Sequence, residues 1–472
     1  MSLMDTARGA YTRSPRFLRR TAGPLLAMIP TRLKFGSSYR VWRERIALAA
    51  TDPAYAGAQQ LAAFRSLLAK AHEGSPFYRC LIDKAFGPCF DPDAIELSDL
   101  SRLPVLGKDQ LTKAGDRALA VPRWQVDVGT TSGSNGEAPF SFYLDKDRSA
   151  REMAFVYDVW SRTGYAEGDA RACLRGFGVG AHSERLHEWD PALRELRLSA
   201  FPLTRADVAL YLDLIDARRI RYIYGYPSSV ELMCRHMRAL GRRPKLPIRG
   251  LLLISEPLYD HQRRAIAEVL GDVPIACFYG LSEKALFGAE VAGSPGVYDF
   301  NPLYSLAELL DENDQPITEP GREGRLVGTS LLTTGMPFIR YDTGDYAQLV
   351  ERPSAENGQR LRVKALSPRR KPDYLVAADG NRVVTVDLTP ENPVLFNGID
   401  EFQFYQDTPG QVLIRYIPSP DGSAADAERL ATHLQTRAHG RLDFSTRRVE
   451  RIAAGRGGKR AFIDQRLDLS RY

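Results

Sequence analysis

The sequence has few of the residues that build metal centres and disulfide scaffolds. Its five cysteines include no Cys-x-x-Cys pair, and its seven histidines show no metal-ligand spacing. We therefore expect neither structural zinc nor a disulfide framework. Cysteine usage of this kind fits a reducing cytoplasm, which is the expected location.

Long hydrophobic runs are missing as well. The longest uncharged apolar stretch near the start, residues 21–31, contains two prolines and is far shorter than the ~18–20 residues that a membrane-spanning helix needs. No spanning helix is expected. Because the stretch lacks a convincing small-residue cleavage site, we expect no signal peptide either.

Two common nucleotide-binding motifs are absent from the loop at residues 128–139, Val-Gly-Thr-Thr-Ser-Gly-Ser-Asn-Gly-Glu-Ala-Pro. It has no closing Gly-Lys-Ser/Thr and no Gly-x-Gly-x-x-Gly. Its glycines and hydroxyls instead let backbone and side chains donate hydrogen bonds to phosphate, which makes ATP use the first hypothesis. Residues 124–128 and 140–144 predict a strand on each side of this turn. The alternative is a flexible Gly/Ser connector.

The chain has only a small excess of positive charge, with a formal net charge of +6, but this excess is concentrated at the start of the sequence. Residues 1–46 contain ten Lys or Arg against Asp5 and Glu44. Such a basic arm fits an acidic partner, such as a carrier protein, or an anionic membrane surface, and we expect no nucleic-acid partner. The alternative is a solvated segment packed loosely on the body.

The length of 472 residues exceeds the ~250–300 residues of a single core, so two or more domains are expected. The predicted division has three parts. A basic arm covers residues 1–46, and a large domain covers 47–368, with the phosphate loop at 129–139 and a barrel-like part at about 300–366. A small domain covers 369–472.

The hydrophobic pattern predicts an α/β fold. One amphipathic helix is expected over 56–72, and after residue 206 helices alternate with strands. This alternation is typical of a parallel sheet covered on both faces, with ligands beyond the carboxyl ends of its strands. The expected helices are 206–219, 227–240 and 258–270, and the expected strands are 220–224, 248–254 and 274–278.

Short β segments replace this alternation after about residue 300. Strands are expected at 324–329, 338–341 and 346–350, arranged as a meander or small barrel. A strand at 411–417 and a helix at 424–439 then predict a separate small α+β domain at the end of the chain.

The remaining motifs are weak one at a time. Asp345 in Arg340-Tyr341-Asp342-Thr343-Gly344-Asp345 is compatible with a turn carboxylate, Glu283 with a helix-capping acid and Lys459 with a solvated loop cation. Their order is more informative. A hydroxyl-rich loop is followed by Tyr-Gly-x-Ser-Glu, then Arg-Tyr-x-Thr-Gly-Asp, then Arg-x-x-Asp-x-Leu and a late Gly-Lys.

This series resembles the adenylate-forming superfamily of acyl-CoA synthetases. Residues 71–79 and 103–108 also look like the opening region of its phenylacetate-CoA ligase branch, which includes capsule-biosynthesis-type members. The resemblance runs from about residue 40 to the end. It implies a large α/β domain, a small mobile lid, and the use of ATP and Mg²⁺.

The resemblance also implies roles for particular residues. Glu283 would hold Mg²⁺, Asp345 both ribose hydroxyls, and Lys459 the substrate carboxylate and α-phosphate during catalysis. The implied ATP-binding residues are Thr130, Thr131 (also catalytic), Ser132, Gly133, Ser134, Gly136, Ser255, Glu256, Tyr279, Gly280, Ser282, Asp345 and Arg370.

The chain departs from the family pattern in two places. Asn135 stands where a Thr is usual and Phe140 where a Lys is frequent, so one contact to phosphate charge is missing. At the expected hinge, Arg369-Arg370 replaces Gly-Arg, and Pro372 stands at the usual pivot. Because proline fixes φ, either the pivot lies at another residue or the thiol-transfer step is altered.

The expected activity is that of an AMP-forming acid-thiol ligase. The acceptor would be coenzyme A or a carrier-protein phosphopantetheine, and domain motion would gate turnover. An aromatic acid is expected from the implied acyl pocket, formed by Phe177, Gly178, His182 and Tyr226; the alternative for His182 is a core imidazole. The alternatives are an amine or hydroxyl acceptor, or a catalytically weakened nucleotide-binding protein in polysaccharide or lipid assembly.

Overall fold

The structure is a computed structural model of the chain. It describes residues 23–26, 28–29, 31–130, 140–175, 186–200, 203–256, 258–368, 374–384, 395, 398–418, 422–452 and 463–468. These residues divide into two compact units. The first lies within Met1–Asp127 and Tyr143–Ser367, and the second within Val128–Phe142 and Pro368–Tyr472.

Helices dominate the start of the first unit. They are α3 (Thr31–Lys34), α4 (Gly36–Thr51), α5 (Pro53–Gly74), α6 (Pro76–Phe86) and α7 (Lys108–Ala114), with 3₁₀ turns at Pro92–Ala94, Leu97–Arg102, Gly115–Ala118 and Arg123–Gln125. Helix α5 begins where Asp52 accepts a hydrogen bond from the Tyr55 N–H at 2.9 Å and where Pro53 presets φ. It contains the predicted helix 56–72, with Phe64, Leu67 and Leu68 buried.

A mixed sheet of twelve strands forms the centre of the first unit in the described chain. Its order is β11-β12-β13-β14-β10-β9-β8-β7-β6-β3-β5-β4. Strands β5, β3, β6, β7 and β8 run parallel to their neighbours in this series. The strands are β3 (Arg171–Leu174), β4 (His187–Asp190), β5 (Glu195–Leu198), β6 (Tyr222–Gly225), β7 (Gly250–Ile254), β8 (Ile275–Gly280), β9 (Phe287–Val291), β10 (Ser294–Phe300), β11 (Ser305–Leu310), β12 (Glu323–Ser330), β13 (Tyr341–Glu351) and β14 (Arg362–Pro368).

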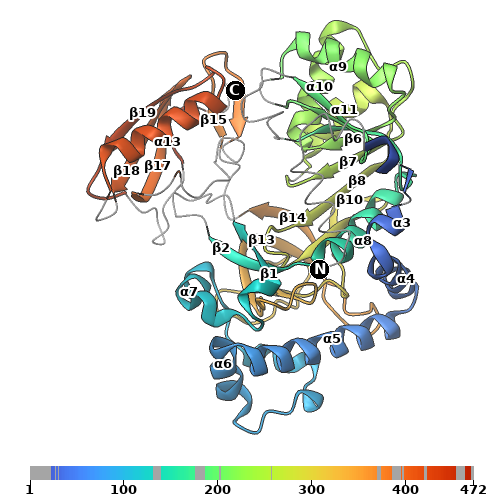
Figure 1. Ribbon diagram of the computed structural model, residues 1–472, viewed down its shortest axis with the longest axis vertical. Helices are drawn as coiled ribbons and strands as arrows, with labels where there is room; N and C mark the ends of the chain where they lie inside the picture. Colours follow the sequence, from blue (N-terminus) through green and yellow to red (C-terminus); the bar gives the residue numbers. More distant parts are fainter. Residues whose placement is uncertain are drawn as a thin grey trace. The chain divides into compact units, whose positions relative to one another are not determined.

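Helices cover both faces of the parallel strands, as the alternation in the sequence predicted. Helices α9 (Arg205–Ala217), α10 (Pro227–Leu240) and α11 (Asp260–Leu270) share a core with Leu251 and Leu253 of β7 (Figure 1). The intervening Leu252 belongs to the core on the other face, which α4 and α8 (Arg148–Ser161) help to form. Successive side chains of a strand point to opposite faces, so β7 is buried on both.

Most predicted bounds are confirmed to within a few residues. Helix α10 has its predicted ends, because Pro227 opens it and Gly241, at φ +63°, terminates it in a left-handed conformation. Strand β6 starts two residues later than expected. Its predicted first residue, Ile220, instead donates its N–H to Ile215 O at 3.0 Å as α9 ends.

The predicted strands 338–341 and 346–350 are wrong as separate elements. One strand, β13, runs from Tyr341 to Glu351 through the Thr-Gly-Asp sequence. Its pairing with β12 shifts, with Val327 opposite Asp342 and Arg325 opposite Tyr346, so residues 343–345 form a bulge. Gly344, at φ +78°, makes this bulge possible. The expected turn is therefore a bulge inside a strand, and it redirects Asp345.

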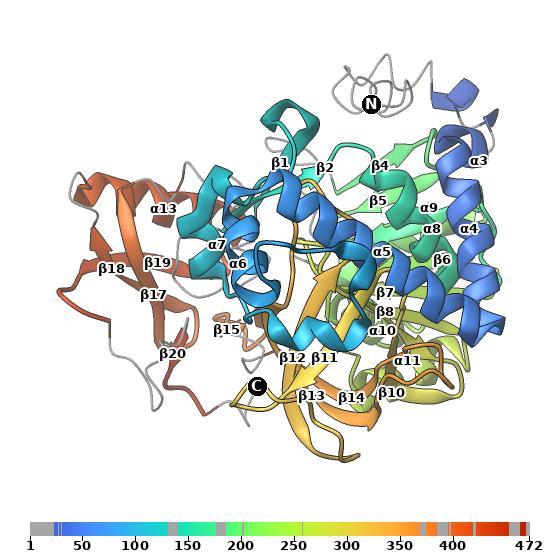
Figure 2. The ribbon, with the colours of Figure 1, turned by 90° about the horizontal axis from the view of Figure 1, so that it is seen from below.

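The second unit contains a small α+β domain. Strands β17 (Ile399–Thr408), β18 (Gln411–Pro418), β19 (Asp443–Arg448) and β20 (Ile463–Gln465) pair in the order β19-β18-β17-β20. Helix α13 (Ala424–Arg437) packs on this sheet through Ala427, Leu430 and Leu434 (Figure 2). A short pair, β15 (Tyr374–Val376) and β16 (Arg382–Val384), precedes it.

The predicted hairpin around the phosphate loop has its two strands. They are β1 (Val126–Thr130) and β2 (Ser141–Asp145), which form a two-stranded sheet. Among the described residues, no helix combines the length and the apolar composition required to cross a bilayer.

Candidate functional site

Asp345 and Tyr279 meet although 66 positions separate them in the sequence. Tyr279 is near the carboxyl end of β8, and Asp345 is in the bulge of β13. The Tyr279 hydroxyl donates to Asp345 Oδ2 at 2.7 Å. The Tyr279 ring packs edge-on against Phe300, with centroids 5.7 Å apart, which fixes the direction of this hydroxyl.

Glu283 forms a second pair of the same kind. It lies in the turn after β8, where only 3% of its surface is exposed, and its Oε1 accepts a hydrogen bond from the Tyr341 hydroxyl at 2.7 Å. Tyr341 is fully buried at the start of β13. Strand β13 and the end of β8 therefore bring the two predicted carboxylates into one region.

Electrostatic coupling joins these groups. Burial raises the pKa of Asp345 to about 6, and the charges of Glu283 and Asp342 act in the same direction. The hydrogen bond from Tyr279 and the charge of Lys108 oppose this rise. Burial also raises the pKa of Tyr279 and of Tyr341, so both stay protonated hydrogen-bond donors. A cluster of desolvated carboxylates favours cations and hydroxyl donors as ligands.

Lys108 is a residue of this site to which the sequence assigned no role. The segment before it lies against β13: Leu106 N–H donates to Arg340 O, and Leu106 O accepts from Asp342 N–H, each at 2.9 Å. Helix α7 begins at Lys108, whose charge lowers the pKa of Asp345. The motif at residues 103–108 was the only signal, and nothing in it indicated proximity to Asp345.

The predicted residues at the neighbouring strand ends take other contacts. Both oxygens of Glu256, after β7, accept from Ser228, one from its N–H and one from its hydroxyl, each at 3.0 Å. Burial raises the pKa of Glu256. Ser255 is exposed in a left-handed conformation, at φ 69°. Glu256 thus fastens the first turn of α10, and its part in ATP binding stays a prediction.

Tyr226 follows β6 at the same edge of the parallel sheet. Its N–H donates to Leu174 O at 3.3 Å, and the Arg175 guanidinium lies 5.9 Å from its ring centroid. Arg175 also donates to the Tyr224 hydroxyl at 2.6 Å. Tyr226, Glu256 and Tyr279 therefore lie at or just after the carboxyl ends of three adjacent parallel strands.

Three other predicted residues lie at or near strand ends. Gly280 is the exposed last residue of β8, Ser282 is exposed in the turn that follows, and Thr130 is the last residue of β1. The remaining predicted residues lie outside the described ranges, and their roles stay predictions. They are Thr131, Ser132, Gly133, Ser134, Gly136, Phe177, Gly178, His182, Arg370 and Lys459.

A metal at Glu283 would take its other ligands from a nucleotide and water. Within the described ranges, no three or more His, Cys, Asp or Glu side chains gather as a protein-only metal site. The buried Glu283 carboxylate nevertheless fits Mg²⁺, which typically uses one or two carboxylates together with phosphate oxygens. The donor set is compatible with the predicted Mg²⁺–ATP.

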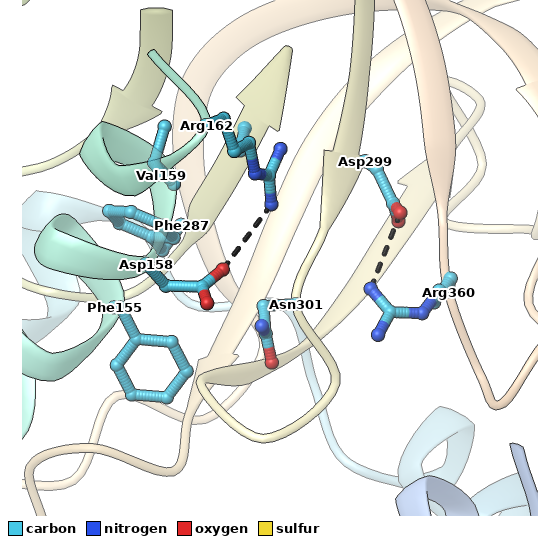
Figure 3. Close-up of a pocket in the computed structure, with 9 residues that line it drawn as sticks. Phe155, Asp158, Val159, Arg162, Phe287, Asp299, Asn301 and Arg360 are labelled. Carbon is cyan, nitrogen blue, oxygen red and sulfur yellow. Dashed lines mark hydrogen bonds and ion pairs between the residues drawn. The ribbon is translucent and has the colours of Figure 1, made fainter. Parts of the chain in front are cut away.

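A polar pocket elsewhere in the first unit has a different character. It lies between α8 and strands β9 and β10, and its volume is only about 20 Å³ (Figure 3). Arg162 pairs with Asp158 at 3.4 Å and Arg360 with Asp299 at 3.3 Å. Because its charged groups are paired with one another and it contains no predicted site residue, we do not assign the activity to it.

Several known proteins are similar to this chain, although no family model matches it. The chain is 22% identical over 375 residues to the protein CapK of Staphylococcus aureus, covering 78% of this chain and 80% of CapK. It is 29% identical over 295 residues to a phenylacetate-coenzyme A ligase of Thermus thermophilus, covering 60% of this chain and 63% of that ligase, less than two thirds of its length.

Among solved structures, the chain is similar to a 2-hydroxyisobutyryl-CoA ligase in complex with 2-HIB-AMP and CoA. The identity is 20%, the TM-score is 0.56, and the match covers 88% of this chain and 91% of that one. The fold is therefore that of the adenylate-forming ligases. In sequence, the chain is similar to CapK and to phenylacetate-coenzyme A ligases.

Proposed function

We propose that the protein is an ATP-dependent, AMP-forming acid–CoA ligase. A carboxylic acid and ATP would give an acyl-adenylate and pyrophosphate, and the thiol of coenzyme A would then displace AMP to form a thioester. The names of the relatives support this activity. The observation that carries it is that the end of β8 and strand β13 bring the buried Glu283 and the half-buried Asp345 into one region, where Tyr279 and Tyr341 hold the two carboxylates and the charge of Lys108 acts on Asp345.

Each residue of this cluster has a task that its chemistry suits. Asp345 would accept hydrogen bonds from the two ribose hydroxyls, and Tyr279 keeps its carboxylate oriented at 2.7 Å. Glu283 would hold Mg²⁺, with Tyr341 fixing one of its oxygens. When bound, Mg²⁺ neutralises charge that develops on the departing pyrophosphate. Lys108 would balance the acidic character of the region.

The rest of the proposed machinery comes from the sequence. Residues 129–139 would wrap the phosphates, Arg370 would reach ribose or phosphate, and Lys459 would enter from a mobile domain that starts at residue 369. Ser255 and Glu256 would lie near adenine. These assignments and the three-part division of the chain are proposals.

An aromatic acid is the proposed substrate. The ends of β3 and β6 place the half-buried Tyr226 beside the half-buried Arg175, whose guanidinium also donates to the hydroxyl of the buried Tyr224, so that an aromatic ring lies beside a cation. A flat aryl ring suits such surfaces. We keep transfer to a carrier protein, an amine or a hydroxyl as alternatives that the product would distinguish.

Exchange of labelled pyrophosphate into ATP tests the first half-reaction. We expect exchange that depends on an added acid, fastest with an aryl acid in a panel that also includes fatty and amino acids. Mass spectrometry with coenzyme A should then detect the acyl-CoA thioester and AMP. No exchange with any acid would contradict adenylation, whereas exchange without thioester would favour a carrier, amine or hydroxyl acceptor.

We also propose a cytoplasmic protein whose basic arm touches an anionic membrane surface. All five cysteines are free thiols, which suits a reducing compartment. Leu25, Met28 and Leu33 are 60–79% exposed within a basic segment, a combination that fits anionic lipid. Leu33→Glu should reduce sedimentation with phosphatidylserine vesicles. Equal binding to phosphatidylcholine vesicles, or binding unaffected by salt, would contradict the proposal.

A further inference from the structure

The turn that carries Glu283 has an unusual backbone. Lys284 N–H donates to Leu281 O at 3.1 Å and closes the turn, and Lys284 itself adopts φ +61°. Residues with a side chain rarely adopt this left-handed conformation, which glycine adopts readily. A lysine therefore keeps it only where neighbouring contacts hold it.

Two contacts from distant parts of the chain hold Lys284. The Ser330 hydroxyl, fully buried at the end of β12, donates to Lys284 O at 2.8 Å. The Lys284 ammonium lies 2.5 Å from Glu152 Oε1 on α8. The side chains of Lys284 and Glu152 are only 21% and 24% exposed, so solvent screens this ion pair less than a surface pair.

These contacts act on the residue next to Glu283. Lys284 ties the turn to α8 and β12, while Glu283 is bonded to Tyr341 at the start of β13. Rotation of the turn would move both side chains together, because they are consecutive along the chain. Glu152 belongs to none of the motifs in the sequence, and the ion pair gives it a part in the site.

We infer that Glu152 and Lys284 are a positioning pair that fixes the carboxylate of Glu283 for Mg²⁺–nucleotide. The inference rests on the proposed function, since Mg²⁺–ATP is the ligand that Glu283 would hold. Glu152 and Lys284 act through Glu283 and need not touch the nucleotide. Outer groups that orient a metal ligand commonly change metal affinity by about 10- to 100-fold.

The test uses the full chain and measures ATP binding by calorimetry over a series of Mg²⁺ concentrations. Lys284→Gly removes the ammonium but accepts the left-handed backbone, so the turn and the fold are retained. Glu152→Gln removes the partner charge at constant size. Each should weaken Mg²⁺-dependent ATP binding about tenfold, with a smaller effect on ATP without Mg²⁺. Arg238→Met, which breaks the exposed 2.8 Å pair with Glu268, is the matched control and should bind as wild type.

The double variant Glu152→Gln/Lys284→Gly identifies the pair. Its loss should equal that of either single variant, because both remove one interaction, whereas additive losses would show two independent effects and overturn the inference. Wild-type Mg²⁺ dependence in Lys284→Gly and Glu152→Gln would also overturn it while leaving the ligase proposal intact. Absence of Mg²⁺-dependent binding in the wild-type chain would instead contradict the proposed function.

Discussion

Asp345 is held in an environment that opposes its own ionisation. Its pKa of about 6 compares with an ordinary value of 3.8, and burial is the largest cause. The native state therefore keeps a proton over a pH range in which the unfolded chain has released it. Asp345 therefore does not reduce the free energy of unfolding below about pH 4. As the pH rises to about 6, the free energy of unfolding falls by roughly 3 kcal/mol.

Replacing Asp345 by Asn should remove this fall. As the pH rises from about 4 to 7, the free energy of unfolding of the variant should gain roughly 3 kcal/mol relative to that of wild type. Urea unfolding without nucleotide measures this difference. Lys108→Met should have the opposite effect and deepen the wild-type fall, because Lys108 favours the charged carboxylate. ATP affinity should decrease in Asp345→Asn, since an amide accepts on only one atom. Parallel stability profiles of all three proteins would contradict this account.

The sequence predicted some residues of this cluster but could not predict all of them. Glu283 and Asp345 are part of ordered motifs, so their spacing in the chain was sufficient. Lys108 reaches the same region only because Leu106 pairs beside Tyr341. Glu152 is involved only because α8 packs near the turn after β8. Such long-range pairings leave no periodic signal in the sequence.

Among the elements, the parallel strands β3 and β6 leave no room for a side chain at the end of β6. At Gly225, the last residue of β6, a Cβ would lie 2.6 Å from Leu174 O and 3.0 Å from Leu174 Cβ. The same oxygen accepts from the N–H of Tyr226. Strands β3 and β6 can approach to this distance only because residue 225 has no side chain.

Gly225→Ala should therefore destabilise the protein by roughly 1–3 kcal/mol, since the added methyl group must separate β3 from β6. Urea unfolding measures the loss. The KM for the acid should also rise more than that for ATP, because Tyr226 is the next residue.

A second glycine-to-alanine variant supplies the control. Gly57 lies within α5, where a Cβ would be 3.7 Å from the nearest side-chain atom, an ordinary contact. Gly57→Ala should leave stability unchanged or raise it by up to about 1 kcal/mol, because alanine favours helix. Equal stability of the two variants would show that β3 and β6 are not tightly apposed.

Helices and strands were predicted well where the hydrophobic period or the capping residue lies within or next to the element itself. Helix α10 shows this, with Pro227 and Gly241 marking its ends. Strand β13 shows where such prediction fails. Thr343-Gly344 is typical of a turn, but in the pairing of β13 with β12 these residues form a bulge inside the strand. The strands after residue 300 also join the central sheet through β14 and β10, a pairing that depends on distant segments.

At the scale of the whole molecule, the described residues form two units with separate cores. The first contains the carboxylate cluster, and the second has its own core of β17, β18 and α13. The family resemblance assigns the two half-reactions to different groups. Asp345 and Glu283 of the first unit would hold the ribose and Mg²⁺, and Lys459 would act only while the acyl-adenylate forms.

Lys459→Ala should therefore separate the two half-reactions. Acid-dependent pyrophosphate exchange should fall about 10²- to 10³-fold, the usual effect of removing a group that stabilises developing charge. Calorimetry should find ATP affinity within a few-fold of wild type, because Asp345 and Glu283 are unchanged. Supplied with a synthetic acyl-adenylate, the variant should still form acyl-CoA at nearly the wild-type rate, since that step does not use the ammonium. An equal loss in both steps would instead assign Lys459 to the stability of the small domain and remove it from the proposed chemistry.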